Sequence, residues 1–180
     1  MKKIALFAIL LASSAILLAQ NDSRFSTDGA SVKWQNVYQT QLDSAGVVDG
    51  LLASGKFDGF VQTKDGFTCR ILQHEVNWRG MGIKRGTLPM YMLGGELDAH
   101  ATVQIREGRY RVTVDEIVFT DTVSGGLFVP GKRTRFEDYA LTRKGEFRDN
   151  FWRPGAAPVL DFDLFSLFEI KEQEAQEEDW

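Results

Sequence analysis

The clearest alternation of apolar and polar residues lies between Asp98 and Thr120. Every second residue is apolar before the Glu107-Gly108 pair and again after it. Alternation on both sides of a two-residue turn that contains glycine predicts a β-hairpin. At Asp115-Glu116 the alternation slips by one residue, which predicts a β-bulge that keeps both halves facing one core. The expected apolar pairs across the hairpin are Ile105 with Tyr110, Val103 with Val112, and Ala101 with Val114.

A strand and a helix are predicted before this hairpin. Aromatic and β-branched residues make Trp34–Thr40 a first strand. The next apolar residues recur at the spacing of one helical face, with Asp43 or Ser44 as N-cap and Gly55 just past the end. The helical apolar residues are Val47, Val48, Leu51 and Leu52.

The rest of the chain supplies further strands and a closing helix. Strands are predicted at Phe57–Gln62 and Phe67–Trp78, and Met90–Leu93 is also strand-like. Arg135–Thr142 is predicted to form a short helix or turn. Asp161–Gln176 has apolar residues with acids between them and is interpreted as an amphipathic helix that covers the sheet.

This order of elements describes an α+β domain: strand, helix, about four antiparallel strands, helix, with the helices packed on one face of the sheet. The length of 180 residues fits one domain with a substantial core. The predicted segments are a signal peptide at 1–19, a flexible lead-in at 20–33, the α+β domain at 34–122, and a C-terminal extension at 123–180. This extension contains the closing helix and an acidic tail.

The first residues are typical of a secretory signal. Lys2 and Lys3 precede an apolar run from Ile4 to Leu18 and the small residue Ala19. The run is short for a membrane span, so we predict cleavage near Ala19 and export to the periplasm or beyond, with no transmembrane segment in the mature protein. A retained membrane anchor is the alternative.

Charge and cysteine content narrow the function further. Removing Lys2 and Lys3 leaves 19 basic against 25 acidic residues, a net charge of −6, which is unfavourable for general nucleic-acid binding. Cys69 is the only cysteine, so the chain forms no internal disulfide. Its apolar surroundings predict a buried side chain rather than a reactive thiol.

Three stretches carry a resemblance to a known family: WQNVYQT, LLASGKF and IREGRYRVTVDEIVF. They resemble the domain of unknown function 4468 family, exported bacterial proteins that are common in Bacteroidota and have a TBP-like fold. The resemblance covers roughly Trp34–Thr120 and leaves Val123–Trp180 outside. It implies one helix after the first strand, four more strands and a final helix. A fold name does not transfer DNA binding, and the family supplies no catalytic residues.

The solvent face of the hairpin carries three arginines, Arg106, Arg109 and Arg111. Because like charges that face each other destabilise a sheet, we expect an acidic group nearby. One interpretation is a site for an anion or an acidic partner. The other is an arginine face neutralised by Glu107, Asp115 or the acidic C-terminal segment, with the arginine stems covering sheet surface.

A second basic set lies in the glycine-rich stretch from Arg79 to Gly86. Its glycine spacing is similar to that of a phosphate-binding loop, but such a loop must open a helix, and a strand-like run follows here. We therefore predict a surface loop. Arg79, Lys84 and Arg85 are candidate contacts to an anionic surface, with Met81 and Ile83 inserting beside them.

Motifs for chemistry are weak. His74 and His100 are the only histidines, and neither has a second histidine at ligand spacing or a nucleophile motif nearby. Asp161 and Asp163 lack the glycine and distal glutamate of a calcium loop, so helix capping is the favoured role. We predict no catalytic residue, no metal and no cofactor.

Aromatic residues suggest an apolar contact surface. Most of the Trp and Phe side chains should be core, but four are candidates for exposed contacts: Trp152, Phe162, Phe165 and Phe168. The sequence therefore predicts an exported, non-catalytic binding or accessory domain that engages a protein partner or an amphiphilic ligand through the groove between sheet and helix. The alternative is an envelope-associated structural protein acting by self-association or surface contact, and a hydrolase is third.

Overall fold

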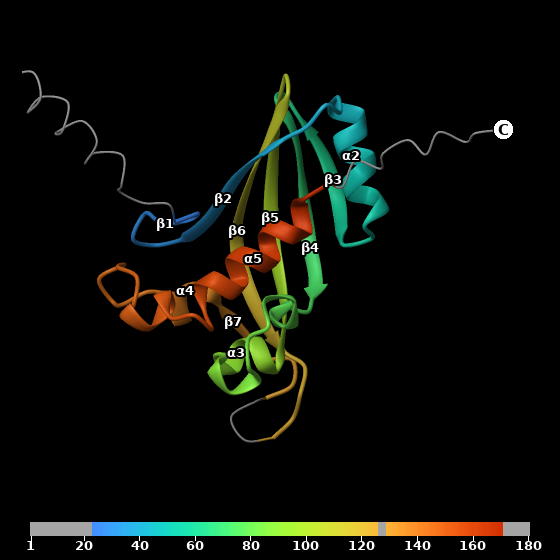
Figure 1. The fold of residues 1–180 in the computed structure, drawn as a ribbon. Helices are drawn as coiled ribbons and strands as arrows, with labels where there is room; N and C mark the ends of the chain where they lie inside the picture. Colours follow the sequence, from blue (N-terminus) through green and yellow to red (C-terminus); the bar gives the residue numbers. More distant parts are fainter. Residues whose placement is uncertain (1–22, 126–128, 171–180) are drawn as a thin grey trace, which may run out of the picture.

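An antiparallel sheet of seven strands forms the centre of the computed structural model, which describes residues 23–125 and 129–170 (Figure 1). The strands run in the order β1-β2-β6-β5-β4-β3, and β7 pairs with β6. The chain is therefore an α+β protein. Its strands are β1 (Phe25–Thr27), β2 (Val32–Gln39), β3 (Phe57–Thr63), β4 (Gly66–His74), β5 (Gly95–Arg106), β6 (Arg109–Asp121) and β7 (Arg133–Arg135).

Four α-helices and three short 3-10 helices connect or cover these strands within the described ranges. The α-helices are α2 (Ser44–Ala53), α3 (Met90–Leu93), α4 (Phe136–Ala140) and α5 (Ala157–Phe168). The 3-10 helices are η1 (Trp78–Met81), η2 (Arg85–Thr87) and η3 (Asp149–Trp152). α2 connects strands near opposite edges of the sheet, because it follows β2, which lies next to the edge strand β1, and precedes β3, the strand at the other edge.

The central hairpin has the predicted register. Ile105 pairs with Tyr110, Val103 with Val112, and Ala101 with Val114. The predicted bulge is also confirmed, because the register shifts between Asp98 and His100 and the opposite strand accommodates an extra residue. Glu116 takes a positive φ of 51° at this point, a conformation that single residues in bulges adopt.

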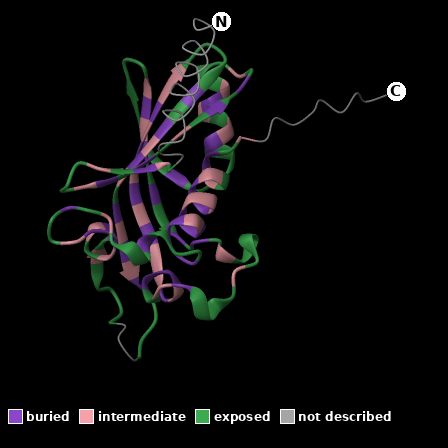
Figure 2. Cartoon of the chain, turned by 60° about the vertical axis from the view of Figure 1, so that its left-hand side comes forward, coloured by how far each residue is buried: buried purple, intermediate pink, exposed green. Residues whose placement is uncertain are grey.

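The two faces of the sheet differ sharply in burial. One face is apolar and is covered by α5, which crosses in front of the strands in Figure 1. The helix contributes Val159, Leu160, Leu164 and Phe168, none of which is exposed to solvent. The side chains of the opposite, outer face are half-buried or exposed, as the alternating colours along the strands in Figure 2 show. The outer face is therefore the open one.

The first helix follows the expected local signals. The Asp43 side chain accepts a hydrogen bond of 2.8 Å from the Gly46 N–H, so Asp43 is the N-cap. Gly55 lies just beyond the helix with φ 64°, the left-handed conformation that ends many helices. α4 lies within the segment predicted to form a short helix or turn.

Two local predictions are wrong because short elements depend on distant partners. Met90–Leu93 forms the helix α3 directly after Pro89, not a strand. The lead-in contains β1, and Phe25 is buried and pairs with Trp34. The prediction of a flexible segment up to residue 33 therefore fails there, and β2 already begins at Val32.

The closing helix begins earlier than predicted. α5 starts at Ala157, with Pro158 in its first turn, a position that suits proline because the first helical N–H groups have no partner. Asp161 and Asp163 consequently lie inside the helix and do not cap it. The helix ends at Phe168. The predicted signal peptide, residues 1–19, and the acidic segment 171–180 lie outside the described residues.

Candidate functional site

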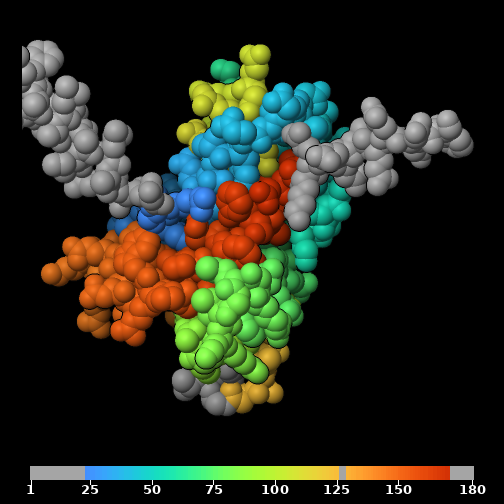
Figure 3. All heavy atoms as spheres, in the orientation of Figure 1, coloured from blue at the N-terminus to red at the C-terminus, as the bar shows by residue number. Residues whose placement is uncertain are grey.

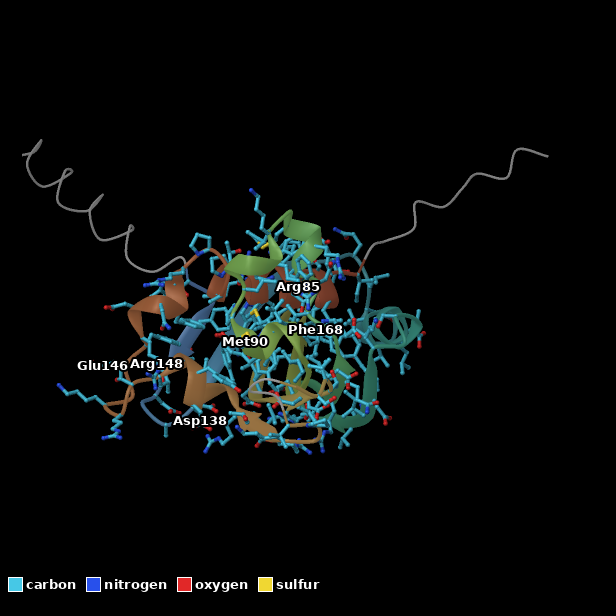
Figure 4. The ribbon with its side chains drawn as sticks, turned by 90° about the horizontal axis from the view of Figure 1, so that it is seen from below. Arg85, Met90, Asp138, Glu146, Arg148 and Phe168 are labelled. Carbon is cyan, nitrogen blue, oxygen red and sulfur yellow. The ribbon has the colours of Figure 1, made fainter. Side chains whose placement is uncertain are left out.

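The groove expected between the sheet and the closing helix is filled by the helix itself. In Figure 3 the atoms of α5 fit directly between the N-terminal strands and the segment around α3. Phe168 has no exposed surface, and its ring lies 4.8 Å from that of Phe57 and 6.4 Å from that of Trp34. Figure 4 labels it in the centre of the molecule. Phe168 is therefore a core residue, which corrects its prediction as a contact for a partner.

Polar contacts hold α5 along its whole length. At its C-terminal end the hydroxyls of Tyr38 and Tyr110 donate to the carbonyls of Phe165 and Phe168, at 2.9 and 2.7 Å. Both carbonyls lie in the last turn, where helix carbonyls run out of intrahelical donors, although that of Phe165 still accepts the Glu169 N–H at 3.1 Å. Nearer its start, the Trp34 indole N–H donates to Asp161 at 2.7 Å. A helix tied at both ends leaves little room for an amphiphilic ligand beneath it.

A buried polar pair, His74 and Asp163, connects α5 to the end of β4. His74 Nε2 lies 2.8 Å from Asp163 Oδ2, and the two side chains are only 8% and 3% exposed. The other carboxylate oxygen accepts the backbone N–H of Asn77, also at 2.8 Å. His74 sits at the end of β4, next to Gln73, whose positive φ of 49° accompanies a break in register. This geometry gives His74 and Asp163 a structural role.

The predicted arginines come together on the open face of the sheet. Arg106 pairs with Arg109 across the hairpin end, and Arg111 pairs with Gln104. On the neighbouring strand Val37 is the partner of Arg111. These five residues line a shallow pocket of about 200 Å³, which we call the arginine pocket. Its apolar part is Val37, a valine that is 46% exposed.

The arginine pocket holds positive charge without a counter-ion among the described residues. Arg111 donates to the side-chain oxygen of Gln104 from Nε, at 3.0 Å, and from Nη2, which orients its guanidinium group. None of the ion pairs within residues 23–125 and 129–170 includes Arg106, Arg109 or Arg111. Asp115 contacts His100 instead, at 3.0 Å.

Glu107, the second expected neutraliser, is an exposed residue of the hairpin turn and takes part in none of those ion pairs. Guanidinium groups present planar sets of N–H donors that match carboxylates and phosphates. Three of them beside an exposed apolar side chain can bind an anionic group attached to a small apolar one. Because the site is open to water, added salt should weaken such binding.

Sequence reasoning found the arginines but missed Val37 and Gln104. The hairpin register places Gln104 opposite Arg111, so the alternation already contained that signal. Val37 needed the pairing of β2 with β6, strands that lie more than seventy residues apart in the sequence.

The second basic set lies near the ends of β5 and β6 that are farthest from the hairpin turn. Arg79 and Arg85 line a separate pocket of about 220 Å³ together with Glu75, Gly95 and Thr122. The Arg79 guanidinium group lies 4.4 Å from the centre of the Trp78 ring, a cation–π contact. Lys84 is exposed and does not line this pocket. Five of the six predicted basic residues therefore line two separate pockets, and the second pocket also contains the acidic residue Glu75.

The remaining aromatic candidates gather around α5 and η3. Trp152 is 45% exposed, whereas Phe162 and Phe165 are half-buried. The indole of Trp152 packs edge-on against the rings of Phe147 and Phe151, both at about 5 Å. Trp152 also borders a pocket of about 250 Å³ at the start of α5. Its polar neighbours there are already engaged, because Arg24 bonds to Asp161 at 2.6 Å.

Groups suited to chemistry are buried or dispersed. Cys69 is only 1% exposed, and burial raises the pKa of its thiol to about 12. A protonated thiol is a poor nucleophile. In the part of the chain that the structure describes, no group of three or more His, Cys, Asp or Glu side chains is placed to hold a metal ion.

Comparisons with known proteins give no relative. No family model matches the chain, and neither the search of curated proteins nor that of solved structures found a match. Among the described residues, no helix combines the length and the apolar character that crossing a membrane requires.

Proposed function

We propose that the protein is an exported, non-catalytic binding module that engages an acidic protein partner through the arginine pocket. The observation that carries this proposal is the group of three arginines around a pocket on the open face, without a counter-ion among the described residues. The close packing of α5 against the sheet favours a protein partner over an amphiphilic ligand. A ligand that bound between α5 and the sheet would have to displace buried side chains.

We also propose that the domain has a TBP-like fold and belongs to the domain of unknown function 4468 family. The order β2, α2, β3, β4, β5, β6, α5 supports this, since it is the layout that the resemblance implies. The proposal that the protein is exported rests on the basic and apolar residues at 1–19. The proposed function itself rests on the arginine pocket and does not depend on the family.

Self-association at the cell envelope is the second candidate. The observation that favours it is the edge strand β3, on which Val61 is 60% exposed. An unpaired strand edge can pair with another chain. However, β3 is bulged between Asp58 and Val61, and bulges hinder such pairing.

The proposed function is tested by binding of a fluorescent oligoglutamate peptide to the mature chain. We expect Arg109→Gln to weaken binding about fivefold, the equivalent of about 1 kcal/mol, which is typical of one exposed charge pair. Arg70→Gln is the matched control. Arg70 is an exposed arginine on the same face, pairs with His100 and Asp58, and does not line the pocket.

Peptide binding that neither substitution changes would contradict the proposal. An equal loss in both variants would also contradict it, because it would indicate a general effect of net charge. Self-association would appear as a concentration-dependent mass in sedimentation, and Val61→Lys on the edge strand should abolish it.

A further inference from the structure

The arginine pocket lacks a counter-charge within the described residues, but the same chain carries one. We infer that the acidic segment 171–180 binds the arginine pocket in cis and competes there with an external acidic partner. The competition rests on the proposed function, whereas the intrachain contact can be tested without it. The inference combines the charge of the segment, the point where it begins and the distance it must span.

Charge complementarity is the first argument. Residues 171–180 contain one basic residue, Lys171, and five acidic ones: Glu172, Glu174, Glu177, Glu178 and Asp179. Carboxylates are the natural partners of guanidinium groups, which bind them with two parallel hydrogen bonds. Both acids of the described chain that were expected to neutralise the arginines fail to do so, since Asp115 contacts His100 and Glu107 forms no ion pair in the described ranges.

The segment begins directly behind the pocket. The Ile170 N–H donates to the Tyr110 hydroxyl at 3.4 Å. The Ile170 side chain packs so closely against α2 that a Cβ on Gly50 would lie 2.8 Å from its Cγ2. Tyr110 faces the core, and its neighbours in β6 on either side are Arg109 and Arg111, which face outward. The chain therefore leaves the core on the opposite side of the strand that carries the pocket.

The distance is within reach of the segment's second half. From Ile170 the chain would have to run two to three residues along the strand to the hairpin end, cross about 10 Å of sheet thickness, and run back along the other face to the arginine pocket. This route is roughly 25 Å long. An extended chain covers at most about 3.3–3.6 Å per residue. Glu177, Glu178 and Asp179 are seven to nine residues beyond Ile170 and can span it. Glu172 and Glu174 reach only about 7 and 14 Å.

This difference in reach supplies a matched pair of variants. Glu177→Gln with Glu178→Gln removes two charges that reach the pocket, and Glu172→Gln with Glu174→Gln removes two that do not. A tether of this length gives an effective concentration in the millimolar range. We therefore expect the first double variant to bind the oligoglutamate peptide about three- to tenfold more tightly than the unchanged chain, and the second to differ by less than about twofold.

The contact itself is read out without any peptide. In ¹⁵N NMR spectra, the side-chain Nε–Hε signals of Arg109 and Arg111 should shift in the variant of Glu177 and Glu178, and remain in place in the variant of Glu172 and Glu174. The shifts should not depend on protein concentration, because the contact is within one chain. Shifts that grow with concentration would show binding between chains and would overturn the inference.

The outcomes separate the inference from the proposed function. If Arg109→Gln weakens peptide binding but the two double variants behave alike in both measurements, the cis contact is refuted and the binding module stands. If the arginine signals respond to Glu177 and Glu178 but the peptide never binds, the contact stands and the proposed function fails.

Discussion

The buried pair of His74 and Asp163 should be the costliest polar contact to break, and Asp163→Ala tests it. The carboxylate accepts from His74 Nε2 and from the Asn77 N–H, both at 2.8 Å. His74 Nδ1 is buried and has no hydrogen-bond partner among the described residues. The substitution would therefore leave a buried imidazole with no partner on either nitrogen.

The size of the effect follows from these contacts. Leaving a buried donor without its acceptor costs about 1–3 kcal/mol, and two donors are affected. The Asn77 N–H belongs to an exposed residue, so its loss lies at the low end of that range. We expect a decrease of about 3 kcal/mol in the free energy of unfolding, the lower end of the cost of breaking a buried pair. For a chain of this size, this corresponds to a decrease in Tm of about 6–12 °C.

Urea-induced unfolding followed by tryptophan fluorescence measures this change. Ser166→Ala, at an exposed position of the same helix, is the control and should change stability by less than about 0.5 kcal/mol. The double variant His74→Leu with Asp163→Leu should be more stable than Asp163→Ala, because it also removes the buried imidazole and leaves only the Asn77 N–H without its acceptor. The reasoning is refuted if Asp163→Ala costs less than about 1 kcal/mol, or if the double variant is the less stable of the two.

Three further predictions concern single residues. Gly66→Ala should destabilise the protein by more than about 2 kcal/mol in the same urea assay, because φ is 151° and the new Cβ would collide with the Val103 carbonyl oxygen; an unchanged midpoint would contradict this. The Cys69 thiol, whose pKa burial raises to about 12, should react with a disulfide reagent at pH 8 only after unfolding, and rapid labelling of the native protein would exclude that burial. Hydrogen bonds from the Ser31 and Ala30 N–H groups lower the pKa of Asp28 to about 2, below the ordinary 3.8. Its contribution to stability is therefore present above about pH 4 and is lost as the pH falls towards 2, and NMR titration near the ordinary value would contradict it.

Local patterns predicted the central hairpin because the residues that determine its turn and register are close together in the sequence. The alternation and the Glu107-Gly108 turn together determine which residues face each other, and the slip at Asp115 marks the bulge. α3 was misread because four residues are too few to show a helical period. β1 has only three residues and depends on pairing with β2, which no local pattern reveals.

The same distinction applies to the candidate site. Alternation put Arg106, Arg109 and Arg111 on the solvent face, and the structure places them around one pocket. The structural role of Asp163 could not be predicted, because its partner His74 lies 89 residues away in the sequence. The start of α5 was predicted too late, at Asp161, although the first turn of a helix accommodates Pro158.

The contrast between the two faces of the sheet is the strongest argument that the open face has a function. On the covered face, most polar groups that reach α5 are used: two tyrosine hydroxyls donate to helix carbonyls, and Asp161 and Asp163 each accept two hydrogen bonds, while His74 Nδ1 has no partner among the described residues. On the open face, Arg106 and Arg109 are direct neighbours of like charge, an arrangement that lowers stability. Elsewhere on that face Arg133 does have an acidic partner, Asp98, at 3.4 Å. Folding alone would favour the same arrangement at the hairpin end. A cluster that costs stability and lies beside an exposed valine supports the proposal that an anionic group binds there.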